Sequence, residues 1–289
     1  MERRLATILR AASAAAVLAG LAACGDGPGG SSEPPRSLSN VSYGPDPAQV
    51  MDLELPAGRT RQTPVIVFIH GGAWSGGDKS FFLPIDLDKF VVRGYATANI
   101  NYRLAGETVH DPILSQDVTA ALDFIAAHAD EYQVAPASFG LVGHSAGAHL
   151  ALLAGYKYNP DGRIKAVASL AGPTDLTDPL WLLLPGVRST IENYLGVSQV
   201  EAPERWTGAS PVSVATGASP PTILIHGLSD LLVPYRQAER LHLRLQVLQV
   251  PTDYRLFPTY GHDLGYFLNL HFPDAVWNPI FAWFESYVR

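Results

Sequence analysis

Apolar and polar positions follow two different periods along the chain. Residues 64–69 form a continuous apolar run, which is typical of a strand covered on both faces. Between residues 111 and 132 the apolar positions instead recur every three or four residues, which is helical spacing. Further strands are predicted at residues 50–55, 95–102, 139–143, 164–170, 222–226 and 253–257, and further helices at residues 146–156, 235–247 and 274–288. This alternation predicts an α/β fold with a doubly wound, mostly parallel central sheet.

A long interval between two of these strands interrupts the alternation. Residues 172–221 span about 50 positions, whereas a connection of this kind usually has 2 to 6 residues. We therefore expect a small, partly helical cap, inserted at about residues 173–215. Together with this insertion, residues 40–289 are expected to form a single domain.

The chain begins with a pattern of its own. Arg3, Arg4 and Arg10 accompany an apolar segment, residues 11–23, that is too short to span a bilayer as a helix. Basic residues followed by a short apolar run are typical of a secretory signal peptide. We predict that residues 1–23 are such a signal peptide and are cleaved.

The only cysteine of the chain directly follows that segment. Residues 21–24, LAAC, resemble the bacterial lipobox, in which the cysteine is lipid-modified and becomes the mature N-terminus. Residues 24–39 are rich in Gly, Pro and Ser, which is typical of a flexible tether. We therefore expect a lipid anchor on Cys24 and an extracytoplasmic protein held at a bacterial membrane, in the cell envelope. The alternative is an ordinary cleaved signal that leaves Cys24 as an incidental thiol.

Composition and charge exclude several classes of protein. One cysteine among 289 residues is incompatible with a disulfide scaffold and with a thiolate metal cluster. A net charge of −7, without a basic run beyond Arg3 and Arg4, argues against nucleic acid as a partner. The nine histidines include no His-Glu-x-x-His pair, and no nucleotide-binding glycine motif follows a predicted strand. We expect neither a metal nor a cofactor.

A serine flanked by glycines stands where a predicted strand ends and a helix begins. The segment is GHSAG at residues 143–147, and its glycines permit a tight turn that lifts the hydroxyl of Ser145 above the sheet. An ordinary helix N-cap would leave both glycines unexplained, so we interpret Ser145 as a nucleophile. An oxyanion hole then needs backbone N–H donors. Ala146 at the helix N-terminus is one candidate, and Gly72 and Ala73 of the earlier HGGAW segment are the others.

A serine hydroxyl needs a general base, and the base needs an acid that holds its tautomer. His262 follows the last predicted strand, and Asp230 follows the strand before it. The order Ser145, Asp230, His262 is that of nucleophile, acid and histidine in α/β-hydrolases. Asp175 is the alternative acid. Three further histidines near strand ends are expected to orient loops by hydrogen bonding: His70, His144 and His226.

Eight short segments carry a resemblance to a known family. They are HGGAW at 70–74, GDK at 77–79, NYRL at 101–104, GHSAG at 143–147, AGPTDL at 171–176, ASP at 209–211, HGLSDLLVP at 226–234 and YGH at 260–262. From Val50 onward the chain resembles the esterase and lipase branch of the α/β-hydrolases, in particular feruloyl and acetyl-xylan esterases and related carboxylesterases. The resemblance implies a small-molecule ester substrate and hydrolysis through an acyl-enzyme. Ala73 departs from the pattern, since it stands where many members have a third glycine.

The ester itself is left open by the sequence. Trp74, Tyr102 and Trp181 are candidates for stacking on the substrate, but they could equally pack the cap against the sheet. Two other functions stay open. One is an amidase of formamidase or exopeptidase type, and the other is a non-catalytic binding protein on a hydrolase scaffold, against which the intact serine, acid and histidine argue.

Overall fold

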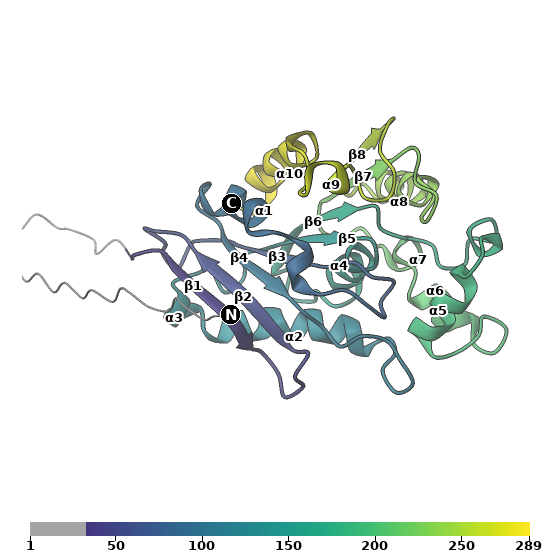
Figure 1. Ribbon diagram of the computed structural model, residues 1–289, viewed down its shortest axis with the longest axis horizontal. Coiled ribbons are helices and arrows are strands. Elements are labelled where there is room, and N and C mark those ends of the chain that lie inside the picture. Colours follow the sequence, from purple (N-terminus) through teal and green to yellow (C-terminus); the bar gives the residue numbers. More distant parts are fainter. Residues whose placement is uncertain (1–32) are drawn as a thin grey trace, which may run out of the picture. The chain divides into compact units, whose positions relative to one another are not determined.

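A mostly parallel sheet forms the centre of the protein (Figure 1). The structure, a computed structural model, describes residues 33–289. Within them the sheet has eight strands in the order β1-β2-β4-β3-β5-β6-β7-β8. β1 pairs antiparallel with β2, and β2 antiparallel with β4, whereas all the other neighbours are parallel. The sheet thus has the mostly parallel arrangement predicted from the sequence.

The elements follow the predicted alternation closely. The strands are β1 (Arg36–Ser42), β2 (Val50–Leu55), β3 (Val65–Ile69), β4 (Ala96–Ile100), β5 (Phe139–His144), β6 (Ile164–Leu170), β7 (Thr222–Gly227) and β8 (Thr252–Phe257). The main helices are α1 (Pro84–Val91), α2 (Ile113–Ala127), α3 (Ala129–Tyr132), α4 (Ala146–Lys157), α8 (Arg236–Val247), α9 (Tyr266–Asn269) and α10 (Asp274–Tyr287). The helix expected at residues 111–132 is therefore divided into α2 and α3.

Two apolar layers cover the two faces of the sheet, as a doubly wound fold requires. The side chains of β3 alternate between these layers: Val65, Val67 and Ile69 lie on one face, and Ile66 and Phe68 on the other. The first layer includes buried residues of α2, α4 and α8, and the second includes buried residues of α1 and α10. All five residues of β3 are buried, which explains the continuous apolar run.

The N-terminal boundary of the domain differs from the expectation. β1 begins at Arg36, so residues 36–39 belong to the sheet and not to the predicted tether. Most side chains of β1 are exposed, and the strand is held mainly by its antiparallel ladder with β2, in which Arg36 faces Leu55 and Ser42 faces Val50. An edge strand of this kind depends on backbone hydrogen bonds, so an apolar pattern does not reveal it. Residues 1–32, including Cys24, lie outside the described part.

The interval between β6 and β7 holds several short helices. These are a 3₁₀ turn η2 (Trp181–Leu183) and the helices α5 (Val187–Leu195), α6 (Pro203–Gly208) and α7 (Pro211–Val214). They fall within residues 173–215, where an inserted cap was expected, and α5 and α6 lie together at one end of the domain (Figure 1). Within residues 33–289, no helix combines the length and the apolar character needed to cross a bilayer.

A buried carboxyl group joins α1 to α10. The side chain of Asp86 is fully buried, and its Oδ1 accepts a hydrogen bond of 2.8 Å from the indole N–H of Trp277. Its Oδ2 has no hydrogen-bond partner among the described residues. Burial raises the pKa of the Asp86 carboxyl above its ordinary value of 3.8. The Asp86 carboxyl therefore binds its proton more tightly in the folded protein than in the unfolded chain.

The variant Asp86→Asn tests the effect of this buried carboxyl on stability. Asparagine still accepts from Trp277 but cannot ionise. A carboxyl group whose pKa is higher in the folded than in the unfolded state stabilises the folded protein at low pH. The wild type loses this stabilisation as the pH rises from the unfolded-state pKa through the folded-state pKa. We expect Asp86→Asn to become the more stable protein by roughly 1–3 kcal/mol at neutral pH, because a neutral amide without a partner costs less to bury than a carboxylate oxygen without one.

Urea unfolding at a series of pH values measures the difference. Asp88→Asn is the matched control, because Asp88 lies on the exposed side of the same helix, and it should show no comparable dependence on pH. A difference for Asp86→Asn that stays constant from acidic to neutral pH would contradict the prediction.

Candidate active site

Ser145 stands on a strained turn between β5 and α4. Its backbone has φ 53° and ψ −120°, outside the regions that side chains favour. A Cβ on Gly143 would collide with the carbonyl of Gly147, and a Cβ on Gly147 with the carbonyl of Ile69, so both glycines are needed for this turn. The side chain of Ser145 makes no capping hydrogen bond to α4, so the helix-cap alternative is wrong.

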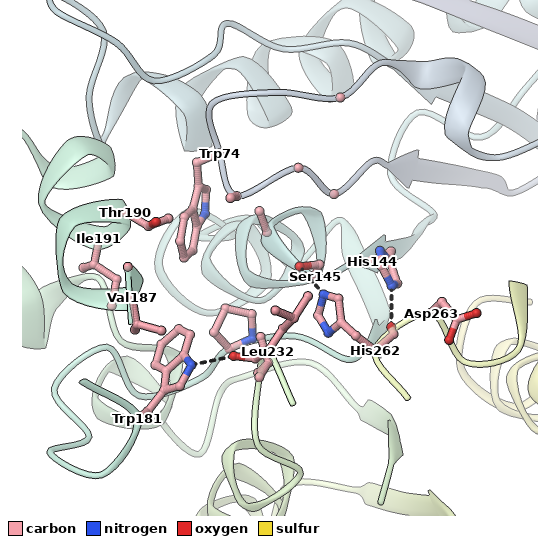
Figure 2. A pocket seen from close by; sticks show the side chains of 18 of the residues that line it. Trp74, His144, Ser145, Trp181, Val187, Thr190, Ile191, Leu232, His262 and Asp263 are labelled. Atoms are coloured by element: carbon pink, nitrogen blue, oxygen red, sulfur yellow. Dashed lines mark hydrogen bonds between the residues drawn. The ribbon is translucent and has the colours of Figure 1, made fainter. Parts of the chain in front are cut away.

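Three predicted side chains meet at the carboxyl end of the sheet. The hydroxyl of Ser145 donates to Nε2 of His262 at 2.8 Å, as Figure 2 shows. On the other side of the ring, Nδ1–H of His262 donates to Oδ2 of Asp230, also at 2.8 Å. Ser145 follows β5, Asp230 follows β7 and His262 follows β8. Parallel strands therefore bring together residues that are far apart in the sequence.

Asp230 lies in a pocket of hydrogen-bond donors. Its Oδ1 accepts from the backbone N–H groups of Leu232 and Val233, each at 2.9 Å, and its Oδ2 also accepts from Nε2–H of His226 at 3.1 Å. Burial alone would raise the pKa of the Asp230 carboxyl, but the hydrogen bonds from His226 and His262 and the positive charge these rings can carry hold it well below its ordinary value. Asp230 is therefore an anion that can stabilise a protonated His262.

The rival carboxylate is engaged elsewhere. Oδ2 of Asp175 accepts from Arg240 at 3.0 Å, and its Oδ1 accepts from the hydroxyl of Thr177 at 2.6 Å. The carboxylate that binds the ring of His262 belongs to Asp230. The structure therefore brings Asp230, and not Asp175, to the ring of His262.

The histidine that precedes the serine fixes the loop after β8. Nε2–H of His144 donates to the backbone carbonyl of His262 at 2.9 Å (Figure 2). Burial, together with the nearby His262, lowers the pKa of His144 to about 3, so its ring stays neutral and keeps one N–H. Similarly, His226 donates to the carbonyl of Val233 at 2.8 Å as well as to Asp230. Both rings orient loops, in agreement with the sequence analysis.

The three candidate oxyanion donors are backbone N–H groups of residues that line one cavity. They belong to Gly72 and Ala73, in the loop of residues 70–77 that we call the oxyanion loop, and to Ala146 at the start of α4. Gly72 has φ 122°, and a Cβ there would collide with the carbonyl of Gly76. Within residues 33–289 these three N–H groups donate no hydrogen bond to another protein group. They are available to a ligand oxygen beside Ser145.

A cavity of about 730 Å³ contains these groups. Besides the residues already described, its walls include Gly77, Phe81, Pro173, Trp181, Pro185, Gly186, Val187, Thr190, Ile191, Leu232, Asp263 and Phe267. Asp263 is the only Asp, Glu, Lys or Arg among the lining residues. The site is therefore largely apolar, which suits a neutral ligand.

Two of the three aromatic candidates for substrate contact line the cavity, and the third does not. Trp74 and Trp181 line the cavity, and the indole N–H of Trp181 donates to the carbonyl of Leu232 at 2.8 Å (Figure 2). Tyr102 does not line it. The ring of Tyr102 is 1% exposed, stacks on His70 at 4.4 Å and donates to the carbonyl of that residue. Tyr102 supports the oxyanion loop from behind, so its assignment to substrate binding is wrong.

One helix of the cap contributes a wall that the sequence analysis missed. Val187, Thr190 and Ile191 of α5 line the cavity opposite Ser145 (Figure 2). Their spacing of three and four residues places them on one face of the helix. That spacing is a detectable signal, but nothing in the sequence indicates which partner this face covers. Among the described residues, no cluster of His, Cys, Asp or Glu could hold a metal ion.

Known proteins resemble this chain in sequence and in fold. Esterase LipC of Mycobacterium tuberculosis is 30% identical over 77% of this chain and 58% of its own length. Kynurenine formamidase of Danio rerio is 27% identical over 63% of this chain and 60% of its own. The chain thus spans somewhat more than half the length of these relatives.

A solved structure shares the fold. A truncated carbohydrate esterase from gut microbiota superimposes with a TM-score of 0.71 at 24% identity, covering 83% of this chain and 94% of its own. At this identity the likeness shows the fold alone, which is that of the α/β-hydrolases. A model of the BD-FAE family matches residues 51–245, more than half of the chain. The chain therefore belongs to the BD-FAE family.

Proposed function

We propose that the protein is a serine hydrolase that cleaves carboxylic esters through an acyl-enzyme. One observation carries the proposal. Ser145, His262 and Asp230 form a hydrogen-bonded series, and the cavity beside them is lined by three residues whose backbone N–H groups donate no hydrogen bond within residues 33–289. A nucleophile, a base with a fixed tautomer and donors for an oxyanion are the parts that acyl transfer requires. The similarity to esterases such as LipC supports the same conclusion.

The proposed mechanism gives each group a role. Ser145 Oγ attacks the acyl carbonyl while Nε2 of His262 takes its proton. The charge that develops on the carbonyl oxygen is held by the N–H groups of Gly72, Ala73 and Ala146. Asp230 stabilises the resulting imidazolium, which then protonates the leaving alcohol. Water repeats the sequence, releases the acid and restores the hydroxyl of Ser145.

We further propose that the substrate is a neutral ester with a short acyl group, or an acylated carbohydrate. The cavity is largely apolar, and Val187 and Ile191 of α5 form part of its wall. We infer that this wall limits the length of the acyl chain. An amide substrate is the second candidate, because a kynurenine formamidase is among the relatives.

Removing the nucleophile should abolish turnover while leaving binding intact. For Ser145→Ala we expect kcat to fall on the order of 10⁶-fold with little change in KM, because the hydroxyl acts in the chemical step. Labelling of the protein by a fluorophosphonate probe should also disappear.

Ser213→Ala is the matched control, since Ser213 is an exposed serine of α7. It should retain both turnover and labelling. Undiminished labelling of Ser145→Ala would refute the assignment of the nucleophile, and a wild-type protein that is neither labelled nor active would favour a non-catalytic binding protein.

A panel of substrates tests the proposed ester. We expect kcat/KM to be highest for p-nitrophenyl acetate and butyrate and to fall for octanoate and laurate, because α5 limits the length of the cavity. Feruloyl and acetylated sugar esters, together with formanilide, complete the panel. Turnover that rises toward laurate would exclude a short acyl group, and faster cleavage of formanilide than of every ester would favour the amidase.

For the N-terminus we propose a lipid anchor on Cys24 and a position outside the cytoplasm at a bacterial membrane. The support is the LAAC segment behind a basic and then apolar N-terminus, together with the single cysteine of the chain. A lipid on the first mature residue would attach the hydrolase to the membrane surface.

Replacing the cysteine tests the anchor. Cys24→Ala should move the protein from the membrane fraction of a bacterial host to the soluble or secreted fraction, because no acyl chain can then be attached. Ser32→Ala, in the same predicted tether, should leave the distribution unchanged. An identical distribution of Cys24→Ala and wild type would contradict the anchor.

A further inference from the structure

Two consecutive residues of the oxyanion loop have a backbone conformation that side chains disfavour. The value of φ is 52° at Ala73 and 62° at Trp74, both in the left-handed region. Such a conformation persists only where surrounding contacts impose it. Because the N–H of Ala73 is one of the proposed oxyanion donors, its direction depends on these contacts.

Main-chain contacts hold only part of this turn. The carbonyl of Gly72 accepts from the N–H groups of Ser75 at 3.1 Å and Gly76 at 2.9 Å, and the carbonyl of Trp74 accepts from Ala105 at 2.8 Å. Of the two strained residues, Trp74 has a side chain that can anchor the loop, because the side chain of Ala73 ends at its methyl group.

The indole of Trp74 is fixed at two points. Its Nε1–H donates to Nδ1 of His149 at 3.2 Å, and its ring stacks on Tyr194 of α5 with centroids 4.6 Å apart and an interplanar angle of 18°. Tyr194 is itself held, because its hydroxyl donates to Asp111 at 2.8 Å. Only 3% of Trp74 is exposed. Its N–H and one ring face are therefore occupied by the protein and are not free for a substrate.

The partner of Trp74 lies on the helix that carries the third donor. His149 is fully buried in α4, one turn beyond Ala146, and its Nε2–H donates to the carbonyl of Ala209 at 2.8 Å. Since that nitrogen carries the proton, Nδ1 is a free acceptor for Trp74. Burial lowers the pKa of His149 to about 4, so the ring is neutral and keeps this arrangement at neutral pH.

We propose that Trp74 and His149 are a positioning pair that sets the N–H groups of Gly72 and Ala73 relative to the N–H of Ala146. The hydrogen bond between them ties the oxyanion loop to α4 and so fixes the positions of the three donors relative to one another. The inference rests on the proposed esterase function. Neither side chain reacts, and each acts through the backbone of the loop.

Substitution of either partner should slow the chemical step. For Trp74→Phe and for His149→Phe we expect kcat to fall on the order of 10²-fold with little change in KM, as for a small displacement of catalytic groups. The double variant should lose no more than either single variant, because both remove the same hydrogen bond. His149→Gln, which offers an acceptor and a donor, should recover about tenfold of the loss.

A second readout separates positioning from general loss of structure. A trifluoromethyl ketone forms a reversible adduct with the serine, whose oxyanion occupies the hole. Its affinity should fall in the variants in proportion to kcat/KM. Tyr156→Phe is the matched control, because it removes a partly buried hydrogen bond of 2.8 Å between the same helix and Thr222. It should lower the thermal stability without changing kcat or inhibitor affinity.

The outcomes distinguish this inference from the function on which it rests. Additive losses in the double variant, unchanged inhibitor affinity, or an equal loss of kcat in Tyr156→Phe would overturn the positioning pair alone. Absence of Ser145-dependent turnover in the wild type would overturn the proposed function, and the pair with it. Thermal unfolding of every variant establishes the temperature at which all of them are folded and can be compared.

Discussion

The backbone turn at Ser145 is the constraint on which the rest of the site depends. A non-glycine residue with positive φ is held there because α4 approaches β3 and β5 so closely that Gly147 touches the carbonyl of Ile69. The N–H of Ser145 also donates to the carbonyl of Leu170 at 2.8 Å, which ties the turn to β6. Three neighbouring strands thus fix the position of the Ser145 hydroxyl. The loops that carry Asp230 and His262 then have to bring their side chains to this one position.

Burial disfavours the charged form of every titratable group around this point, and hydrogen-bond partners decide where a charge persists. His144 and His149 are buried against acceptors that need only one N–H, so each ring stays neutral and works as a fixed connector. Asp230 is also buried, but four donors surround its carboxylate and keep it ionised. Asp230 therefore keeps a negative charge at the place where a positive charge develops on His262.

The sequence predicts those features that follow from local pattern. The turn at Ser145 has its own glycine signature, and Asp230 and His262 each follow a strand whose carboxyl end must lie at the same edge of the sheet. The direction in which a side chain points does not follow from local pattern. Tyr102 also follows a strand, yet its ring turns behind the oxyanion loop, because neighbouring packing decides where a side chain points. For the same reason, no local pattern places α5 over the cavity or pairs Trp74 with a histidine of another element.

The position of the cap in the topology has a consequence for how the protein can diversify. The inserted stretch leaves the sheet at the end of β6 and returns at β7, and these two strands are adjacent and paired. Its replacement by another segment would leave strand order and register intact, and the proposed nucleophile, acid and base all lie outside it. The cavity wall can therefore be exchanged without rebuilding the sheet, provided that the new segment supplies what Ala209 and Tyr194 give to His149 and Trp74.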